Sequence, residues 1–118
     1  MRKYKISGKL PSCNEYIDAC RRNRFAAAKM KNEAEKLIGF QIHDTEPVTG
    51  AVRLRFVWHE HNRRRDKDNV AFAKKFILDA LQKKGVLPND NNHYVAGFED
   101  SFEYGGEYGV EVEIYAAE

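Results

Sequence analysis

The sequence lacks the segments that carry a chain into or across a membrane. No run approaches the roughly 18 consecutive apolar residues of a membrane span. No apolar stretch follows the basic N-terminus, as it would in a signal peptide. Internal repeats, low-complexity tracts and linkers are also missing. We therefore expect a soluble, cytoplasmic protein.

Cysteine is scarce as well. The two cysteines, Cys13 and Cys20, stand seven positions apart in one expected helix, which separates them by about 10.5 Å along its axis. A disulfide needs Cα atoms within about 7 Å, so we expect two free thiols in a reducing compartment. Because no Cys-x-x-Cys pair is present, the sequence also lacks the usual cysteine ligands of structural zinc.

The composition of the sequence is typical of one folded domain over residues 1–118. The chain is 42% hydrophobic and 12% aromatic, enough to bury a core. Its net charge of +2 conceals an asymmetry. All 20 Lys and Arg but only ten of the 18 acidic residues lie within residues 1–88, giving +10 there and −8 beyond. A basic body suits a polyanion such as DNA, although mixed charges also serve solubility alone.

Hydrophobic periodicity predicts an α+β fold with the order β-α-β-α-β-β. A mixed sheet of about four strands would carry two helices packed on it. The first helix is expected to be long, with a basic outer surface, and the second to begin at the N-cap Asp68 and end before Gly85. The expected elements cover residues 3–6, 12–37, 52–59, 68–84, 94–104 and 110–114.

Acidic residues at the two ends of the second expected helix form a candidate metal site. Asp66 and Asp68 follow a hydrophobic strand, and Asp90 lies in the turn after the helix. Three carboxylates that converge would suit Mg²⁺, and the arginines at 63–65 would hold phosphates during metal-assisted phosphodiester hydrolysis. On the residues alone, Asp68 could equally cap a helix and Asp90 make a turn.

Helical geometry brings a lysine toward the same site. At 100° per residue, Lys75 and Asp79 each fall within about 20° of Asp68, whereas Lys74 is about 120° away. A lysine side chain leans toward the N-terminus of its helix, so Lys75 would reach a phosphate or water held near Asp68. The alternative is an ordinary surface ion pair between Lys75 and Asp79.

Several motifs together resemble the RusA-type Holliday-junction resolvases of phages and prophages. The family pattern R-x-D-x-D-N corresponds to RRRDKDN at residues 63–69. The family's lysine four residues before D-A-L corresponds to Lys75, and its glycine and acidic turn to Gly85 and Asp90. The segment PSCNEY at 11–16 is similar to the family's N-terminal segment. Two departures are a spacing from Asn69 to Asp79 about one helical turn longer, and Asn89 in place of the first acid of the turn.

This resemblance implies a homodimeric endodeoxyribonuclease of phage or prophage origin that resolves four-way DNA junctions by paired symmetric nicks. It assigns Mg²⁺, with Mn²⁺ as a substitute, to Asp66, Asp68 and Asp90, and a catalytic role to the same acids and Lys75, with Lys74 as the alternative lysine. The DNA backbone would be held by Arg63, Arg64, Arg65, Lys67 and Lys74. The competing function is a DNA-binding module without catalysis, in which the acids only cap and turn.

Other candidates have weaker support. His59, His61 and His93 could bind zinc but lack a fourth ligand. Trp58 and Phe72 could stack on bases, yet both fall in apolar patterns typical of a core or a subunit interface. The arginines Arg21, Arg22 and Arg24 could follow a DNA backbone or form an ordinary solvated helix face.

Overall fold

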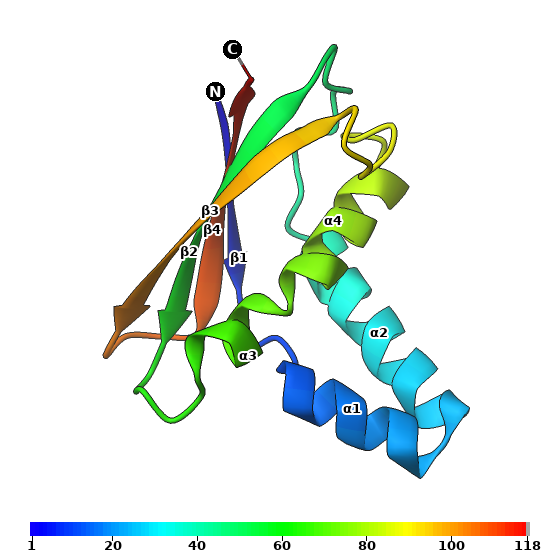
Figure 1. The fold of residues 1–118 in the computed structure, drawn as a ribbon, viewed down its shortest axis with the longest axis vertical. Coiled ribbons are helices and arrows are strands. Elements are labelled where there is room, and N and C mark those ends of the chain that lie inside the picture. The colour runs from blue at the N-terminus through cyan, green and yellow to red at the C-terminus, as the bar shows by residue number, and fades with distance from the viewer. Residues whose placement is uncertain (118) are drawn as a thin grey trace.

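Strand β2 (Val52–Glu60) lies inside a four-stranded mixed sheet. The computed structural model describes residues 1–117. In it β2 pairs antiparallel with β4 (Gly109–Ala116) and parallel with β3 (Val95–Tyr104), and β1 (Arg2–Ser7) pairs antiparallel with β4. The resulting order is β1-β4-β2-β3 (Figure 1). This confirms the predicted α+β class and the mixed sheet of four strands.

The first helical region consists of two helices, so the prediction of one long helix over 12–37 is wrong. Helix α1 (Cys13–Arg22) begins with a capping box in which the Ser12 hydroxyl accepts from the Glu15 N–H and the Glu15 carboxylate accepts from the Ser12 N–H. Helix α2 (Arg24–Gly39) follows after a single residue, Asn23. The backbone of Asn23 is extended, and its side chain accepts a hydrogen bond from the Ala26 N–H. An asparagine that caps the second helix therefore ends the first.

The second helical region is also divided. Helix α3 (Lys67–Ala71) has Asp66 rather than Asp68 as its N-cap, and helix α4 (Lys74–Lys83) follows after two residues. At the break the Ala73 and Phe76 N–H groups donate to carbonyls three residues earlier, the tighter winding of a 3₁₀ turn. After α4, Gly85 takes φ +84°, which confirms its predicted role as the residue that ends the helix.

The last two strands are not neighbours. The α3–α4 segment carries the chain from β2 back to the start of β3, and such a helical crossover makes the two strands parallel. The segment after β3 then passes the end of β2, where the Gly105 N–H donates to the Glu60 carbonyl at 2.9 Å. Strand β4 consequently pairs between β1 and β2, and the predicted turn at 105–109 joins two strands separated by β2.

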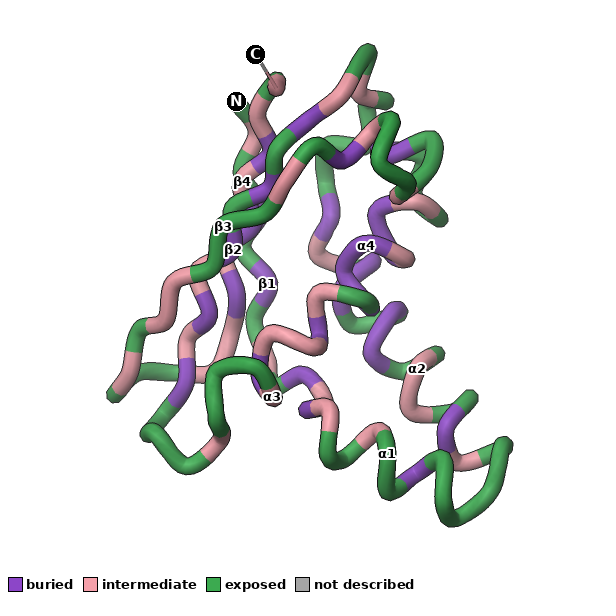
Figure 2. Tube along the Cα trace, in the orientation of Figure 1, coloured by how far each residue is buried: buried purple, intermediate pink, exposed green. Residues whose placement is uncertain are grey.

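The helices cover one face of the sheet but leave β3 partly open. The inward side chains of β1, β2 and β4 are buried, whereas most of β3 is exposed or intermediate (Figure 2). Register places Phe98, Asp100 and Phe102 opposite Leu54, Phe56 and Trp58 of β2, on the helix-facing side. Yet Phe98 is 45% exposed. The edge strand therefore offers a half-open row of side chains beside α3 and α4.

Two smaller findings bear on the sequence predictions. Cys13 and Cys20 are both free thiols. Within residues 1–117, no helix has the length and apolar character that crossing a bilayer would demand.

Candidate active site

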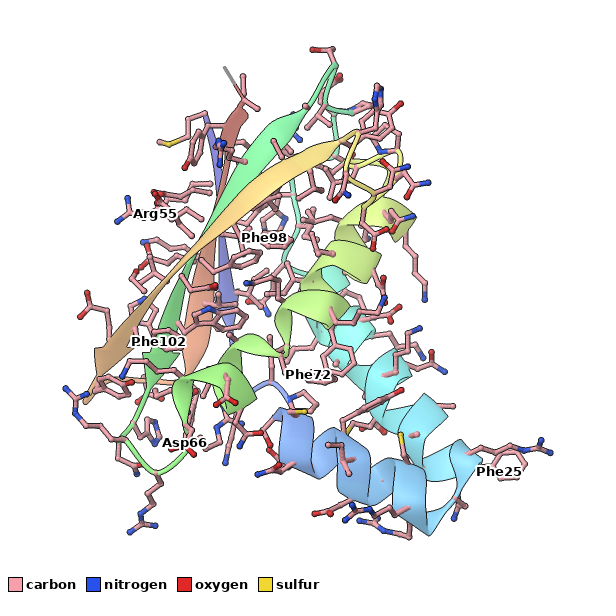
Figure 3. All side chains as sticks on the ribbon, viewed as in Figure 1. Phe25, Arg55, Asp66, Phe72, Phe98 and Phe102 are labelled. Atoms are coloured by element: carbon pink, nitrogen blue, oxygen red, sulfur yellow. The ribbon has the colours of Figure 1, made fainter. Side chains whose placement is uncertain are left out.

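Asp66 and Asp68 lie where the chain leaves β2 and enters α3. We call residues 61–68 the acid end of the α3–α4 segment. Both aspartates are exposed, and Figure 3 shows Asp66 at the margin of the molecule beside α3. Asp66 makes no side-chain capping bond. No hydrogen bond or ion pair within residues 1–117 engages either carboxylate, so the structure leaves both available to a ligand.

A half-buried arginine fixes the acid end to the sheet. Arg65 donates to both carboxylate oxygens of Glu60, at 2.9 and 2.7 Å, and to the Leu10 carbonyl at 3.0 Å. The hydrogen bond to Glu60, followed by the charge of this carboxylate, outweighs burial and raises the pKa of Arg65. The side chains of Arg65 and Glu60 are only 16% and 5% exposed. Arg65, which the sequence assigned to DNA, therefore anchors the backbone immediately before Asp66.

The asparagine of the family pattern connects the acid end to α1. The Asn69 side chain accepts a hydrogen bond from the Asn14 N–H at 2.9 Å. Close by, the Tyr16 ring packs against Phe72 and Phe76, with centroids 5.6 and 5.8 Å away. The PSCNEY segment and the RRRDKDN segment are thus in contact. Phe72, considered above as a base-stacking residue, belongs instead to this packed cluster.

Asp90 lies at the other end of the α3–α4 segment, so the prediction that the three aspartates converge within one chain is wrong. We call residues 85–94 the turn end. Figure 1 shows it separated from α3 by the length of α4, whose ten residues span about 15 Å. Within residues 1–117 no group of three His, Cys, Asp or Glu residues is placed to hold a metal ion. A rigid helix between the two ends keeps Asp90 from Asp66 and Asp68.

The two candidate lysines have different surroundings. The Lys75 side chain is 60% exposed and its ammonium lies 3.7 Å from Asp79, as the alternative interpretation anticipated. Lys74 is only 17% exposed, and its ammonium lies 2.7 Å from Asp100 of β3. Asp100 also accepts a hydrogen bond from the Trp58 indole at 2.9 Å. Counting 100° per residue across the 3₁₀ break is not valid, so the expected shared face of Lys75 and Asp68 loses its basis.

A row of aromatic rings on β3 supports the cations near the acid end. Arg63 lies 4.1 Å from the centroid of the Tyr104 ring, Lys67 lies 5.6 Å from that of Phe102, and Lys74 lies 4.5 Å from that of Phe98. Phe98 and Phe102 are labelled in Figure 3. Sequence reasoning missed these aromatics and Asp100, although their spacing of two along β3 was a usable signal. Arg64 is exposed.

The histidines have separate environments. His59 lies 2.8 Å from Glu111, and the His61 ring packs on Tyr108 at 4.0 Å between centroids. His93 belongs to the turn end, where its ring packs edge-on against Tyr94. The three histidine side chains therefore do not come together in one site.

A comparison with protein families places this geometry in a known context. A family model described as Endodeoxyribonuclease RusA matches residues 12–115, nearly the whole chain, and thereby confirms the resemblance found in the motifs. No curated protein matches the chain. The match spans β2, α3 and the acid end as well as strand β3, whose aromatic rings lie beneath the cations. The chain belongs to the RusA endodeoxyribonuclease family, whose members are Holliday-junction resolvases.

Proposed function

We propose that the chain resolves four-way DNA junctions in an Mg²⁺-dependent reaction that nicks two strands symmetrically. The observation that carries this proposal is the pair of free carboxylates, Asp66 and Asp68, exposed at the start of α3. Mg²⁺ commonly binds one or two carboxylates, completing its shell with water and substrate phosphate. Two carboxylates at the exposed start of a helix, which offer only oxygen ligands, fit that requirement. When bound, Mg²⁺ would activate water and stabilise the leaving oxygen.

The cations around the acid end would hold the DNA. Arg63, Lys67 and Lys74 lie over the aromatic rings of β3, and Arg64 is exposed beside them. Ordered cations of this kind suit a phosphate backbone, which they contact without reading sequence. We assign the scissile phosphate to Lys75, whose ammonium is open to solvent, and the neighbouring phosphates to Lys74. Arg65 supports the site through Glu60 rather than through DNA.

Asp90 would act in the site of a second subunit. Within one chain α4 separates it from Asp66 and Asp68. The family resemblance nevertheless assigns it a metal-binding role. A homodimer reconciles the two, because a two-fold axis can bring the turn end of one chain to the acid end of its partner. Each active site would then be incomplete in a monomer, and the two sites would cut opposite strands.

Substituting Asp68 by Asn tests the catalytic assignment. We expect Asp68→Asn to reduce Mg²⁺-dependent cutting of a four-way junction by at least about a hundredfold, because an amide binds a hard cation poorly. Junction binding should stay equal or become tighter, since a negative charge beside phosphate is removed. The readout is single-turnover cleavage together with a binding titration. Glu46→Gln, at an exposed carboxylate in the loop before β2, is the control. Full cutting by Asp68→Asn would overturn the assignment.

A further inference from the structure

The corner between α1 and α2 carries side chains that the proposed active site does not use. The two helices extend away from the sheet, and their corner lies at the opposite end of the molecule from the N- and C-termini of the chain (Figure 1). At this corner Asn23 is both the C-cap of α1 and the N-cap of α2. Its N–H donates to the Ala19 carbonyl at 3.2 Å, and its side chain accepts from the Ala26 N–H at 2.8 Å. The corner is therefore a defined turn rather than a frayed end.

Phe25 projects from this corner into solvent. It is 73% exposed, and Figure 3 shows its ring directed away from both helices. The guanidinium carbon of the neighbouring Arg24 lies 5.4 Å from the centroid of the Phe25 ring. A phenylalanine at this position contributes little to the core, because most of its apolar surface stays in water.

The residues around Phe25 are strongly basic. Residues 18–31 carry five Lys or Arg against one acid, a net charge of +4. Three of these cations, Arg21, Arg22 and Arg24, are exposed. Within the described residues 1–117 none of the three joins an ion pair. These arginines thus keep their charge free for an external anion.

We propose that the α1–α2 corner is a second DNA contact, in which Phe25 inserts between stacked bases while Arg21, Arg22 and Arg24 hold the flanking phosphates. An apolar side chain between cations is the arrangement by which proteins wedge open base steps. The inference rests on the proposed function in one respect, because it takes DNA to lie at the acid end. Helix α1 connects the two places: it begins beside Asn69 and its ten residues extend about 15 Å.

This distance specifies where the wedge would act. With α1 placed along the duplex axis, at about 3.4 Å of axis per base step, the corner would reach bases about four or five steps from the phosphate at the acid end. Charge argues against a second copy of the chain as the occupant of the corner. A two-fold contact through it would bring the arginines of the two copies together, and the repulsion between like charges would oppose the contact.

The test uses junctions that carry 2-aminopurine, whose fluorescence rises when its base is unstacked. One fluorescent base is placed at each position along the arms, and full-length protein is added in EDTA so that no strand is cut. We expect a rise near four or five steps from the mapped nick. Phe25→Ala should abolish that rise and weaken junction binding by about tenfold. Phe40→Ala is the matched control, because Phe40 is also highly exposed, at 82%, but caps the other end of α2.

Two further measurements make the outcome decisive. Arg22→Gln should weaken binding and make it less dependent on salt, as loss of one phosphate contact predicts, while circular dichroism confirms that the variants fold. Unchanged fluorescence and affinity in Phe25→Ala would overturn the proposal. So would a change in sedimentation showing that Phe25 joins subunits. Because no readout requires cutting, failure of the metal assignment would leave a positive result for Phe25 intact.

Discussion

The acid end and the turn end of the α3–α4 segment are held in different ways. At the acid end Arg65 connects the loop to β2 and to the segment before α1. At the turn end the two limits are tied to the chain around the start of β2, since the Val86 and Tyr94 carbonyls accept from the Val48 and Val52 N–H groups. Between these limits, around Asp90, the bonds are local: for example, the Asn91 side chain accepts from the His93 N–H. The Arg65–Glu60 pair holds the acid end to a distant strand directly beside Asp66, whereas hydrogen bonds to distant elements hold the turn end only at its two limits, away from Asp90. The carboxylates at the acid end are therefore preorganised relative to the sheet.

Removing Arg65 should have the largest effect on this difference. Arg65→Ala leaves the Glu60 carboxylate buried without its partner, which should lower the free energy of unfolding by about 3 kcal/mol. Urea unfolding measures the change. Arg64→Ala, in the exposed neighbour, is the control and should change stability by less than about 0.5 kcal/mol. Equal effects of the two substitutions would mean that the Glu60 pair does not fix the acid end.

A substitution at the turn end should cost less. Asn91→Ala removes the side-chain acceptor of the His93 N–H, at 3.0 Å in an exposed setting. We expect a loss of about 1 kcal/mol or less in the free energy of unfolding. Amide hydrogen exchange should increase in residues 88–94 and stay unchanged at 61–68. Faster exchange at both ends would show that the two ends are not independent.

Acid pH should lower the stability of the protein through a third region, the outer face of the sheet. This effect should not differ between the acid end and the turn end. Hydrogen bonds from Lys3 and His59 lower the pKa of Glu111 from 4.5 to about 2. Because the folded-state pKa is the lower one, the stabilisation is fully present above about pH 4.5 and is lost as the pH falls toward 2. Solvent screening limits the effect to about 1 kcal/mol. In Glu111→Gln, acid unfolding should lack this component; an unaltered acid limb would refute it.

The strands could be predicted from sequence because burial on one face leaves a period of two. Predicted strands at 52–59 and 94–104 differ from β2 and β3 by one residue at one end. Pairing partners could not be predicted in the same way, because alternation specifies which face is buried but not which strand lies alongside. The parallel pairing of β2 with β3 depends on the path of α3 and α4 across the sheet.

The helices show where local patterns mislead. Apolar periodicity continues through Asn23 and through the 3₁₀ turn at 72–73, so it predicts unbroken helices. A single capping side chain, at Asn23, overrides it in the first case. Local patterns misled the prediction of the site more than the prediction of the fold. The motif identified Asp66 and Asp68 as neighbours. The separation of Asp90 from these two residues, and the binding of Arg65 to Glu60 rather than to DNA, depend on tertiary contacts that no local pattern contains.

The most direct test of the account is a mixed dimer that joins an Asp68→Asn chain to an Asp90→Asn chain, purified through two different tags. Each homodimer should be inactive on four-way junctions. If Asp90 acts in the partner's site, the mixed dimer regains one complete set of acids and should cut one strand per junction. If all three acids act within one chain, both of its sites are damaged. A mixed dimer that cuts neither strand, or an Asp90→Asn homodimer that cuts both, would contradict the account.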